Sequence, residues 1–180
     1  MQAAGTGFQQ NYFELFSLPA HYQLDAALLD RQYHALQAQF HPDKLSNLSE
    51  AERRASMQSA AHINEAYQTL RSATRRACYM LSLHGVNLPE ETTPAMPADF
   101  LMQQMEWREA IADAQHTGDA HLLVELETRL QHEMRELEAL LAAKISSEQN
   151  YAAAAEDVHK LKFLEKLAEE IASASGAISH

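Results

Sequence analysis

The sequence contains little cysteine, glycine or proline and no long apolar run. Cysteine occurs once, at Cys78, so the chain can form no internal disulfide and no four-thiolate zinc or iron–sulfur site. Only five glycines are present, which disfavours a nucleotide-binding fold. No apolar run is long enough to cross a bilayer, and residues 1–10 lack the pattern of a secretion signal or transit peptide. We therefore expect a cytoplasmic protein with no membrane partner.

Negative charge is concentrated in the second half of the chain. Residues 1–84 hold seven basic and seven acidic side chains, whereas residues 85–180 hold seven basic and eighteen acidic ones, which accounts for the net charge of −11. An acidic half is poorly suited to a phosphate backbone, so we expect no nucleic-acid partner. The step in charge suggests two units with different partners, although an acidic surface kept for solubility explains it equally well.

Composition and helix signals predict an all-α fold, because Ala, Leu, Glu and Gln dominate the sequence. Asp25 is a typical helix N-cap, and Ser49 with Glu52 forms a capping box that begins a second helix. The helix that starts after Asp25 must end near His41, because Pro42 disfavours helical geometry in the residue before it. Two apolar stripes predict that these helices pair antiparallel: Leu29, Tyr33, Leu36 and Phe40 on the first, and Ala60, Ile63, Tyr67 and Leu70 on the second.

One proline-rich stretch separates two helical regions. Residues 85–97 (GVNLPEETTPAMP) contain three of the five prolines and have no helical period. Shorter helices at 12–17 and 72–84 flank the hairpin, the second ending at Gly85. The predicted organisation is a first domain at 8–84, a linker at 85–98 and a C-terminal three-helix bundle at 99–174.

The first helix of that bundle carries apolar residues on two faces. One face, the predicted core, holds Phe100, Trp107, Ile111 and Ala114. The second face, about 140° away around the helix, holds Leu101, Met102 and Met105 and is bordered by Glu106 and Glu109. Gly118 ends this helix.

The next two helices each supply one core stripe. The helix at 119–145 presents Leu123, Leu126, Leu130, Met134, Leu137 and Leu141, and the last helix presents Tyr151, Ala155, Val158, Leu161 and Ala168, with Phe163 opposite. The second face of the first helix is surplus to such a bundle. Surplus apolar groups beside carboxylates suggest a protein-binding patch, and packing against the linker or the first domain is the alternative.

His41, Pro42 and Asp43 lie where a helix ends and a polar loop begins. Pro42 stiffens the turn, Asp43 can accept a bidentate bond from an arginine, and His41 offers a polar ring. The tripeptide alone is a weak signal, because a plain helix stop uses the same residues. A hydrolase or metal enzyme using His41 and Asp43 is one hypothesis, but the intervening proline and the lack of further ligands argue against it. We predict no catalytic residue, no metal, no cofactor and no enzymatic activity.

The first half of the sequence resembles a J-domain, the module that defines DnaJ-type co-chaperones. The resemblance is carried by NYFELF at 11–16, YHALQAQFHPDK at 33–44 and INEAYQTL at 63–70. It implies docking on a DnaK-type chaperone and stimulation of its ATPase through His41, Pro42, Asp43, Lys44, Arg31 and His34. Fewer basic residues precede the loop than is usual for J-domains, which suggests a weaker or more specialised contact.

Three further segments resemble the HscB family, the J-type co-chaperones of iron–sulfur cluster assembly. They are YMLSLHG at 79–85, FLMQQME at 100–106 and KLKFL at 160–164. The absence of a Gly/Phe-rich segment, a CxxCxGxG repeat and the cysteine module of many eukaryotic relatives fits a bacterial HscB rather than a full DnaJ. The resemblance implies an HscA-type chaperone partner and delivery of the scaffold protein IscU to it. By position, the scaffold-binding residues are Leu101, Met102, Met105, Glu106, Glu109, Lys162 and Phe163, with Lys162 standing where the family often has arginine. A J-protein for a different client is the alternative.

Overall fold

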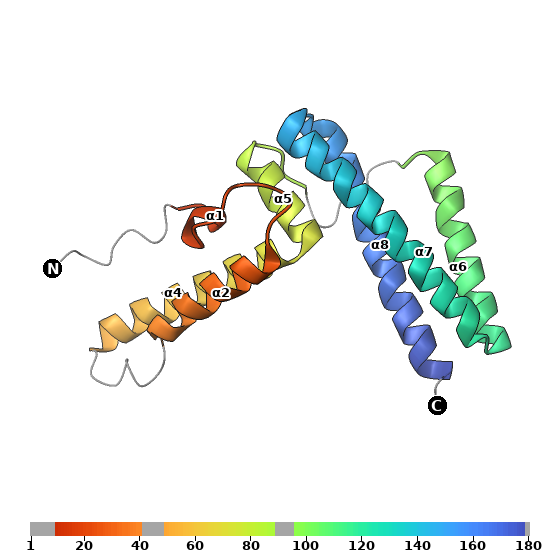
Figure 1. Cartoon of the computed structure of the whole chain (residues 1–180), viewed down its shortest axis with the longest axis horizontal. Coiled ribbons are helices and arrows are strands. Elements are labelled where there is room, and N and C mark those ends of the chain that lie inside the picture. Colours follow the sequence, from red (N-terminus) through yellow and green to blue (C-terminus); the bar gives the residue numbers. More distant parts are fainter. Residues whose placement is uncertain (1–9, 41–48, 89–95, 179–180) are drawn as a thin grey trace. The chain divides into compact units, whose positions relative to one another are not determined.

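The computed structural model describes residues 10–40, 49–88 and 96–178, and it contains no strand within these ranges. The all-α prediction is confirmed (Figure 1). The elements in chain order are α1 (Tyr12–Leu15), α2 (Ala26–Gln37), the 3₁₀ turn η1 (Ala38–Phe40), α4 (Glu50–Arg71), α5 (Ala73–Leu83), α6 (Ala98–Thr117), α7 (Ala120–Ala142), the π turn η2 (Ala143–Ser147) and α8 (Tyr151–Ile178). The chain divides into two compact units, residues 1–80 and 81–180. The domain limits at 84 and 98 stay predictions.

The predicted caps set the starts of the two long helices of the first unit. The Asp25 carboxylate accepts a hydrogen bond from the backbone N–H of Leu28 at 3.0 Å, which satisfies one of the free donors of α2. At the start of α4, the backbone N–H of Glu52 donates to Ser49 Oγ, and Glu52 accepts from the backbone N–H of Ser49 at 2.8 Å. The Glu52 carboxylate also accepts a hydrogen bond from the Ser49 hydroxyl at 2.7 Å, and this bond, followed by the one from the Ser49 backbone N–H, lowers the pKa of Glu52 because it favours the charged form.

Helices α2 and α4 pair side by side through tyrosines. The rings of Tyr33 and Tyr67 stack with centroids 3.9 Å apart. The Tyr33 hydroxyl donates to Asn64 Oδ1 at 3.1 Å, and the Tyr67 hydroxyl donates to Asp30 Oδ1 at 2.9 Å, which raises the pKa of Tyr67. Leu29 is fully buried beside them, so the predicted hairpin is confirmed. The stripe on α4 is wider than predicted, because Ala66 is also fully buried.

The short helix α1 packs on α4 and also contacts α5. The ring of Tyr12 in α1 stacks on Tyr79 of α5 at 4.3 Å, and the Tyr12 backbone N–H donates to the Tyr79 hydroxyl at 2.9 Å. Helix α1 is shorter than the predicted 12–17 and ends at Leu15. Helix α5 ends as predicted, because Gly85 adopts a φ of +80°, which favours glycine.

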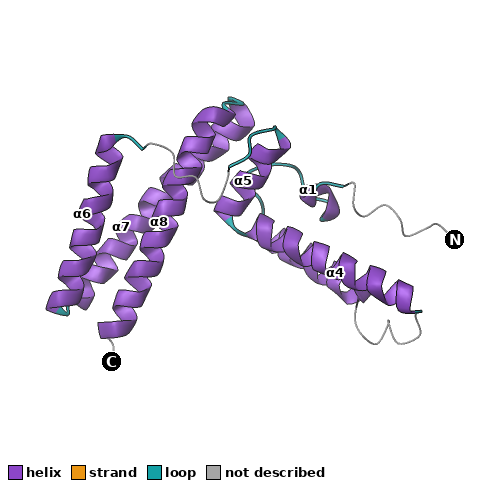
Figure 2. Ribbon diagram, turned by 180° about the vertical axis from the view of Figure 1, so that it is seen from behind, coloured by secondary structure: helices purple, strands orange, loops and turns teal. Residues whose placement is uncertain are grey.

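Helices α6, α7 and α8 form the predicted bundle (Figure 2). The four core residues predicted for α6 are all buried: Phe100, Trp107, Ile111 and Ala114. Gly118 ends α6 with a φ of +69°, and Asp119 caps α7 by accepting a hydrogen bond from the backbone N–H of Leu122. Helix α8 contacts both α6 and α7, so it closes the core.

The core face of α8 differs from the prediction. The buried residues are Ala154, Asp157, Val158, Leu161, Leu164, Leu167, Ile171 and Ala174, whereas Tyr151, Ala155 and Ala168 are only half-buried. The alanine-rich start of α8 offers several equivalent stripes, and a buried aspartate is not expected of a core position. On α7, Met134 is likewise half-buried rather than part of the core.

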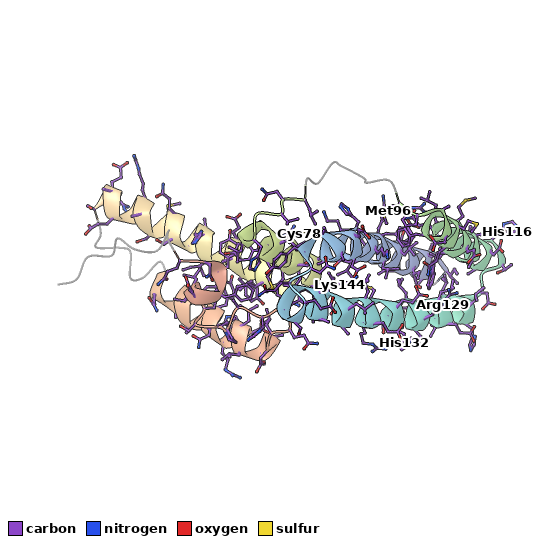
Figure 3. The ribbon with its side chains drawn as sticks, turned by 90° about the horizontal axis from the view of Figure 1, so that it is seen from above. Cys78, Met96, His116, Arg129, His132 and Lys144 are labelled. Atoms are coloured by element: carbon purple, nitrogen blue, oxygen red, sulfur yellow. The ribbon has the colours of Figure 1, made fainter. Side chains whose placement is uncertain are left out.

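Asp157 is the one buried carboxylate among the described residues, with 3% of its surface exposed. It forms an ion pair with Lys144 in η2, a residue labelled in Figure 3, and its other oxygen lies 3.7 Å from Lys160 Nζ. A buried charge is tolerated when it is paired in this way. The ion pair therefore fixes the turn between α7 and α8 to the side of α8.

Candidate functional site

Two of the residues predicted to contact a chaperone lie on α2. Arg31 and His34 are exposed and are three residues apart, so they lie on one face of the helix. His41, Pro42, Asp43 and Lys44 lie outside the described residues. The structure describes the residues on either side of them: η1 ends at Phe40, and Ser49 caps the start of α4.

The surplus apolar face of α6 is exposed in the structure. We define the α6 patch as Leu101, Met102 and Met105, whose exposed fractions are 48%, 61% and 71%. The core residues Phe100 and Trp107 of the same helix are 8% and 2% exposed. The bundle therefore buries one apolar face of α6 and leaves the second one open, as the residue spacing predicts.

Phe163 reaches α6 from α8, but it is half-buried rather than directed away from the core. Its ring meets that of Phe100 edge-on, with centroids 5.4 Å apart and planes at 79°. Arg108 covers it further, since its guanidinium carbon lies 5.6 Å from the ring centroid. Phe163 therefore also contributes to the packing of α8 on α6, and its truncation would disturb both packing and surface.

The charges around the α6 patch are arranged by sign. Glu106 and Glu109 are exposed on the outer side of α6. The cations Arg108 and Lys162 belong to the side on which α8 packs, where burial and then Lys162 lower the pKa of His159. A protein that docks here would meet carboxylates on one edge and cations on the other.

A polar network on the inner side of α6 connects it to α7. The guanidinium of Arg129, labelled in Figure 3, lies 4.5 Å from the centroid of the Trp107 ring. Arg129 Nε donates to Glu133 at 3.1 Å, and Gln103 Nε2 donates to the other oxygen of Glu133 at 3.3 Å. These contacts hold α6 against α7 and so help to fix the orientation of the patch.

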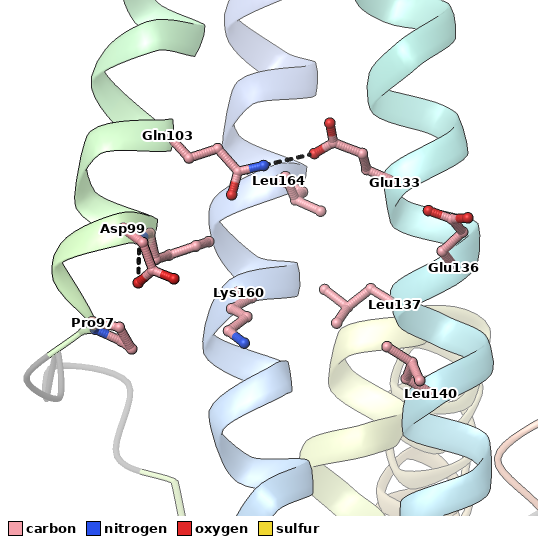
Figure 4. Close-up of a pocket in the computed structure, with 10 residues that line it drawn as sticks. Pro97, Asp99, Gln103, Glu133, Glu136, Leu137, Leu140, Lys160 and Leu164 are labelled. Carbon is pink, nitrogen blue, oxygen red and sulfur yellow. Dashed lines mark hydrogen bonds between the residues drawn. The ribbon is translucent and has the colours of Figure 1, made fainter.

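A cavity of about 470 Å³ lies on the opposite flank of α6 and is lined by residues of α6, α7 and α8 (Figure 4). Its floor includes Phe100 and Leu164, and Asp99, Glu133 and Glu136 supply carboxylates around it. None of the predicted site residues lines this cavity.

Two kinds of feature are absent from the described ranges 10–40, 49–88 and 96–178. No group of three or more His, Cys, Asp or Glu side chains within them could hold a metal ion. Over the same ranges, every helix is too short or too polar to span a bilayer.

Comparison with known proteins identifies the family. Residues 96–172 match the model described as "HSCB C-terminal oligomerisation domain". The chain is 45% identical over 170 residues to "Co-chaperone protein HscB homolog" of Aromatoleum aromaticum, which covers 94% of this chain and 96% of that protein. The chain belongs to the HscB family. The HscB homologue of Ralstonia nicotianae is 44% identical and covers 91% of this chain and 93% of its own length.

Solved HscB structures share the whole fold. "Chaperone HscB from Vibrio cholerae" matches with a TM-score of 0.85 and 39% identity, covering 94% of this chain and 99% of the other. Human HscB matches with a TM-score of 0.86 and 28% identity, covering 96% and 85%. The HscB architecture of a J-domain followed by a helical bundle is therefore that of this chain.

Arg108 is the residue of this region that the sequence analysis missed. It follows the core residue Trp107 and precedes the carboxylate Glu109 in the sequence, so nothing local distinguishes it from an ordinary exposed cation. Its position two turns after Leu101 is the signal that places it on the same stripe as the patch.

Proposed function

We propose that this HscB-family protein is a J-type co-chaperone without enzymatic activity, acting in the cytoplasm. Through its J-domain it stimulates the ATPase of a DnaK-like chaperone of the HscA type. Through its C-terminal bundle it binds the iron–sulfur scaffold protein IscU and delivers it to that chaperone, which aids maturation of iron–sulfur proteins. The exposed α6 patch carries this proposal, because the bundle core is complete without it.

The chaperone contact is assigned to the region from Arg31 to Lys44. Arg31 and His34 offer positive or polar groups on one exposed face of α2. His41, Pro42 and Asp43 follow in the sequence at the end of that helix, where Asp43 can accept a bidentate bond from a chaperone arginine. This arrangement supports docking by charge and hydrogen bonding rather than by apolar burial.

The scaffold contact is assigned to the α6 patch with Glu106, Glu109, Lys162 and Phe163. Exposed methionines suit such a surface, because their flexible side chains adapt to an irregular partner. An apolar centre flanked by charge has the usual anatomy of a protein interface. Lys162 can pair with a carboxylate of the scaffold but cannot form the two parallel bonds of an arginine.

The decisive experiment is the steady-state ATPase rate of the partner chaperone with this protein, with the scaffold and with both. Because the co-chaperone bridges the two, both together should stimulate more than the sum of the separate effects. Simple additivity would contradict the bridging role. This protein incubated with ATP and without the chaperone should hydrolyse no ATP, and metal analysis of it before and after chelator treatment separates this mechanism from hydrolysis by a metal site on this chain.

A J-protein for a different client is the second candidate, and it predicts the same J-domain behaviour. Titration of the full-length protein with purified IscU separates the two. Saturable binding that depends on the α6 patch supports delivery of the iron–sulfur scaffold. Stimulation of the chaperone without any binding of IscU would favour the other client.

A further inference from the structure

A groove continues the α6 patch toward the end of α6. This second cavity, of about 410 Å³, lies between α6 and α8 and is lined by Arg108, Ala112 and Gln115 on one side and by Lys166, Glu170 and Ser173 on the other. Ala112 and Ser173 are exposed and small, so their side chains leave the middle of the groove open. The groove is separate from the cavity on the opposite flank of α6 shown in Figure 4.

On α6, the groove residues lie on the same stripe as Leu101 and Met105 of the patch, and on α8 they lie on the same stripe as Phe163. On α6, Leu101 and Met105 are followed by Arg108, Ala112 and Gln115, at spacings of four, three, four and three. On α8, the corresponding series runs from Phe163 to Lys166, Glu170 and Ser173, at spacings of three, four and three. Such spacings keep side chains on one face of a helix, so the groove continues the patch along α6 and continues from Phe163 along α8.

Arg108 lies at the junction between the edge of the α6 patch and the groove. Its guanidinium lies over the ring of Phe163 at the edge of the patch, and its Nε is 3.9 Å from Glu170 Oε1 inside the groove. An ion pair of that length between half-exposed groups is weak, so the guanidinium can change partner at little cost. A molecule seated on the patch would therefore reach the groove without crossing a gap.

We propose that the groove is the second half of the scaffold-docking surface, which rests on the proposed function of the patch. The scaffold protein anchors apolar side chains on Leu101, Met102 and Met105. An adjacent extended segment of the same protein lies between α6 and α8. Polar groups of that segment meet Arg108 and Glu170, whose opposite charges suit a segment that carries both signs.

Filling the groove tests the proposal. Ala112→Phe and Ser173→Phe each place a large ring in the open middle, so each should weaken binding of the scaffold by about tenfold or more in calorimetric titration. Ala139→Phe is the matched control, because Ala139 is an exposed alanine of α7 that lines neither cavity. The control should bind within about twofold of the unchanged protein, and all three variants should keep the same melting temperature.

A photo-crosslinking amino acid at positions 112, 173 and 139 gives a second readout that does not depend on affinity. Crosslinks to the scaffold from 112 and 173, but not from 139, support the proposal. Unchanged affinity of the filled variants, or absence of crosslinks from 112 and 173 while the scaffold still binds, overturns it. If Leu101→Ala with Met105→Ala leaves affinity intact, the patch assignment itself fails and the groove assignment fails with it.

Discussion

The two units of the molecule present their candidate contact residues in different ways. In the J-domain these residues are charged or polar and lie on α2 and in the segment that follows it. In the bundle, apolar side chains from the open face of α6 form the centre of the surface, and charges surround it. The first candidate surface is thus predicted from a short sequence motif, and the second from apolar side chains that the core does not need.

The interiors of the two units also differ in polarity. The hairpin of the J-domain is connected by tyrosine hydroxyls that bond to Asn64 and Asp30. The bundle relies on leucines and on one buried ion pair between Lys144 and Asp157. We therefore expect the two functions to be lost separately. Changes near residue 43 should affect stimulation of the chaperone alone, and changes on the α6 patch should affect binding of the scaffold alone.

The largest effect is expected from Asp43→Asn. The amide cannot accept a charge-assisted bidentate bond from an arginine, so stimulation of the chaperone ATPase should fall to the basal rate. Scaffold affinity and the circular dichroism spectrum should not change. Asp25→Asn is the matched control, because asparagine caps a helix as well as aspartate does. Normal stimulation by the Asp43→Asn protein would remove the chaperone assignment.

The reciprocal change is Leu101→Ala combined with Met105→Ala. Truncating each apolar anchor at the centre of an interface costs about 1–4 kcal/mol, so scaffold affinity should fall by about 30-fold or more in titration calorimetry. The melting temperature and the stimulation without scaffold should persist, because both side chains are exposed in the free protein. Val124→Ala, an exposed apolar position on α7, is the control. A large drop in melting temperature with affinity unchanged would show that the two side chains serve packing instead.

The third change tests how much the buried ion pair stabilises the bundle. Lys144→Met leaves the buried Asp157 with Lys160 alone, so the bundle should lose about 2–4 kcal/mol of unfolding free energy. Fluorescence of Trp107, the only tryptophan of the chain and part of the bundle core, reports the transition. Asp157→Leu in the same protein removes the buried charge that has lost one of its two partners, and it should restore most of the loss. A single Lys144→Met variant as stable as the parent would show that Lys160 alone suffices.

The smallest effect concerns His159 beside Lys162. Burial and Lys162 lower its pKa below the ordinary 6.5, so the unfolded chain binds this proton more readily than the folded one. Folding stability should therefore be complete above about pH 6.5 and decline as the pH falls through that value. Titration of the His159 ring by nuclear magnetic resonance checks the pKa, and His159→Gln should flatten the pH dependence. A ring pKa at or above 6.5 would contradict this expectation.

The sequence predicted helix ends better than helix faces. Asp25 and Ser49 cap helices, and Gly85 and Gly118 end them, because each uses a local backbone geometry that few residues satisfy. The core face of α6 was equally clear, since large apolar side chains mark it. The face of α8 was not, because its alanine-rich start fits several stripes.

Interactions between helices are the part that spacing within one helix does not reveal. Asp157 is buried only because Lys144, from another element, neutralises it. Phe163 is half-buried because Phe100 and Arg108 of α6 meet its ring. The positions of His41, Pro42 and Asp43 lie outside the described residues, so their role remains a prediction from the sequence and the family.

The α6 patch also has a chemical vulnerability, because two of its three members carry a thioether. Met102 and Met105 are 61% and 71% exposed, whereas Met80 is 5% exposed. Peroxide should therefore convert the first two to sulfoxides well before the third, which peptide mass spectrometry can follow. A sulfoxide is polar where the thioether is apolar. Met57 of α4 is 67% exposed and should oxidise as well, but it lies outside both candidate contact surfaces. Oxidative stress would thus make the apolar α6 patch polar, until a sulfoxide reductase reverses the change.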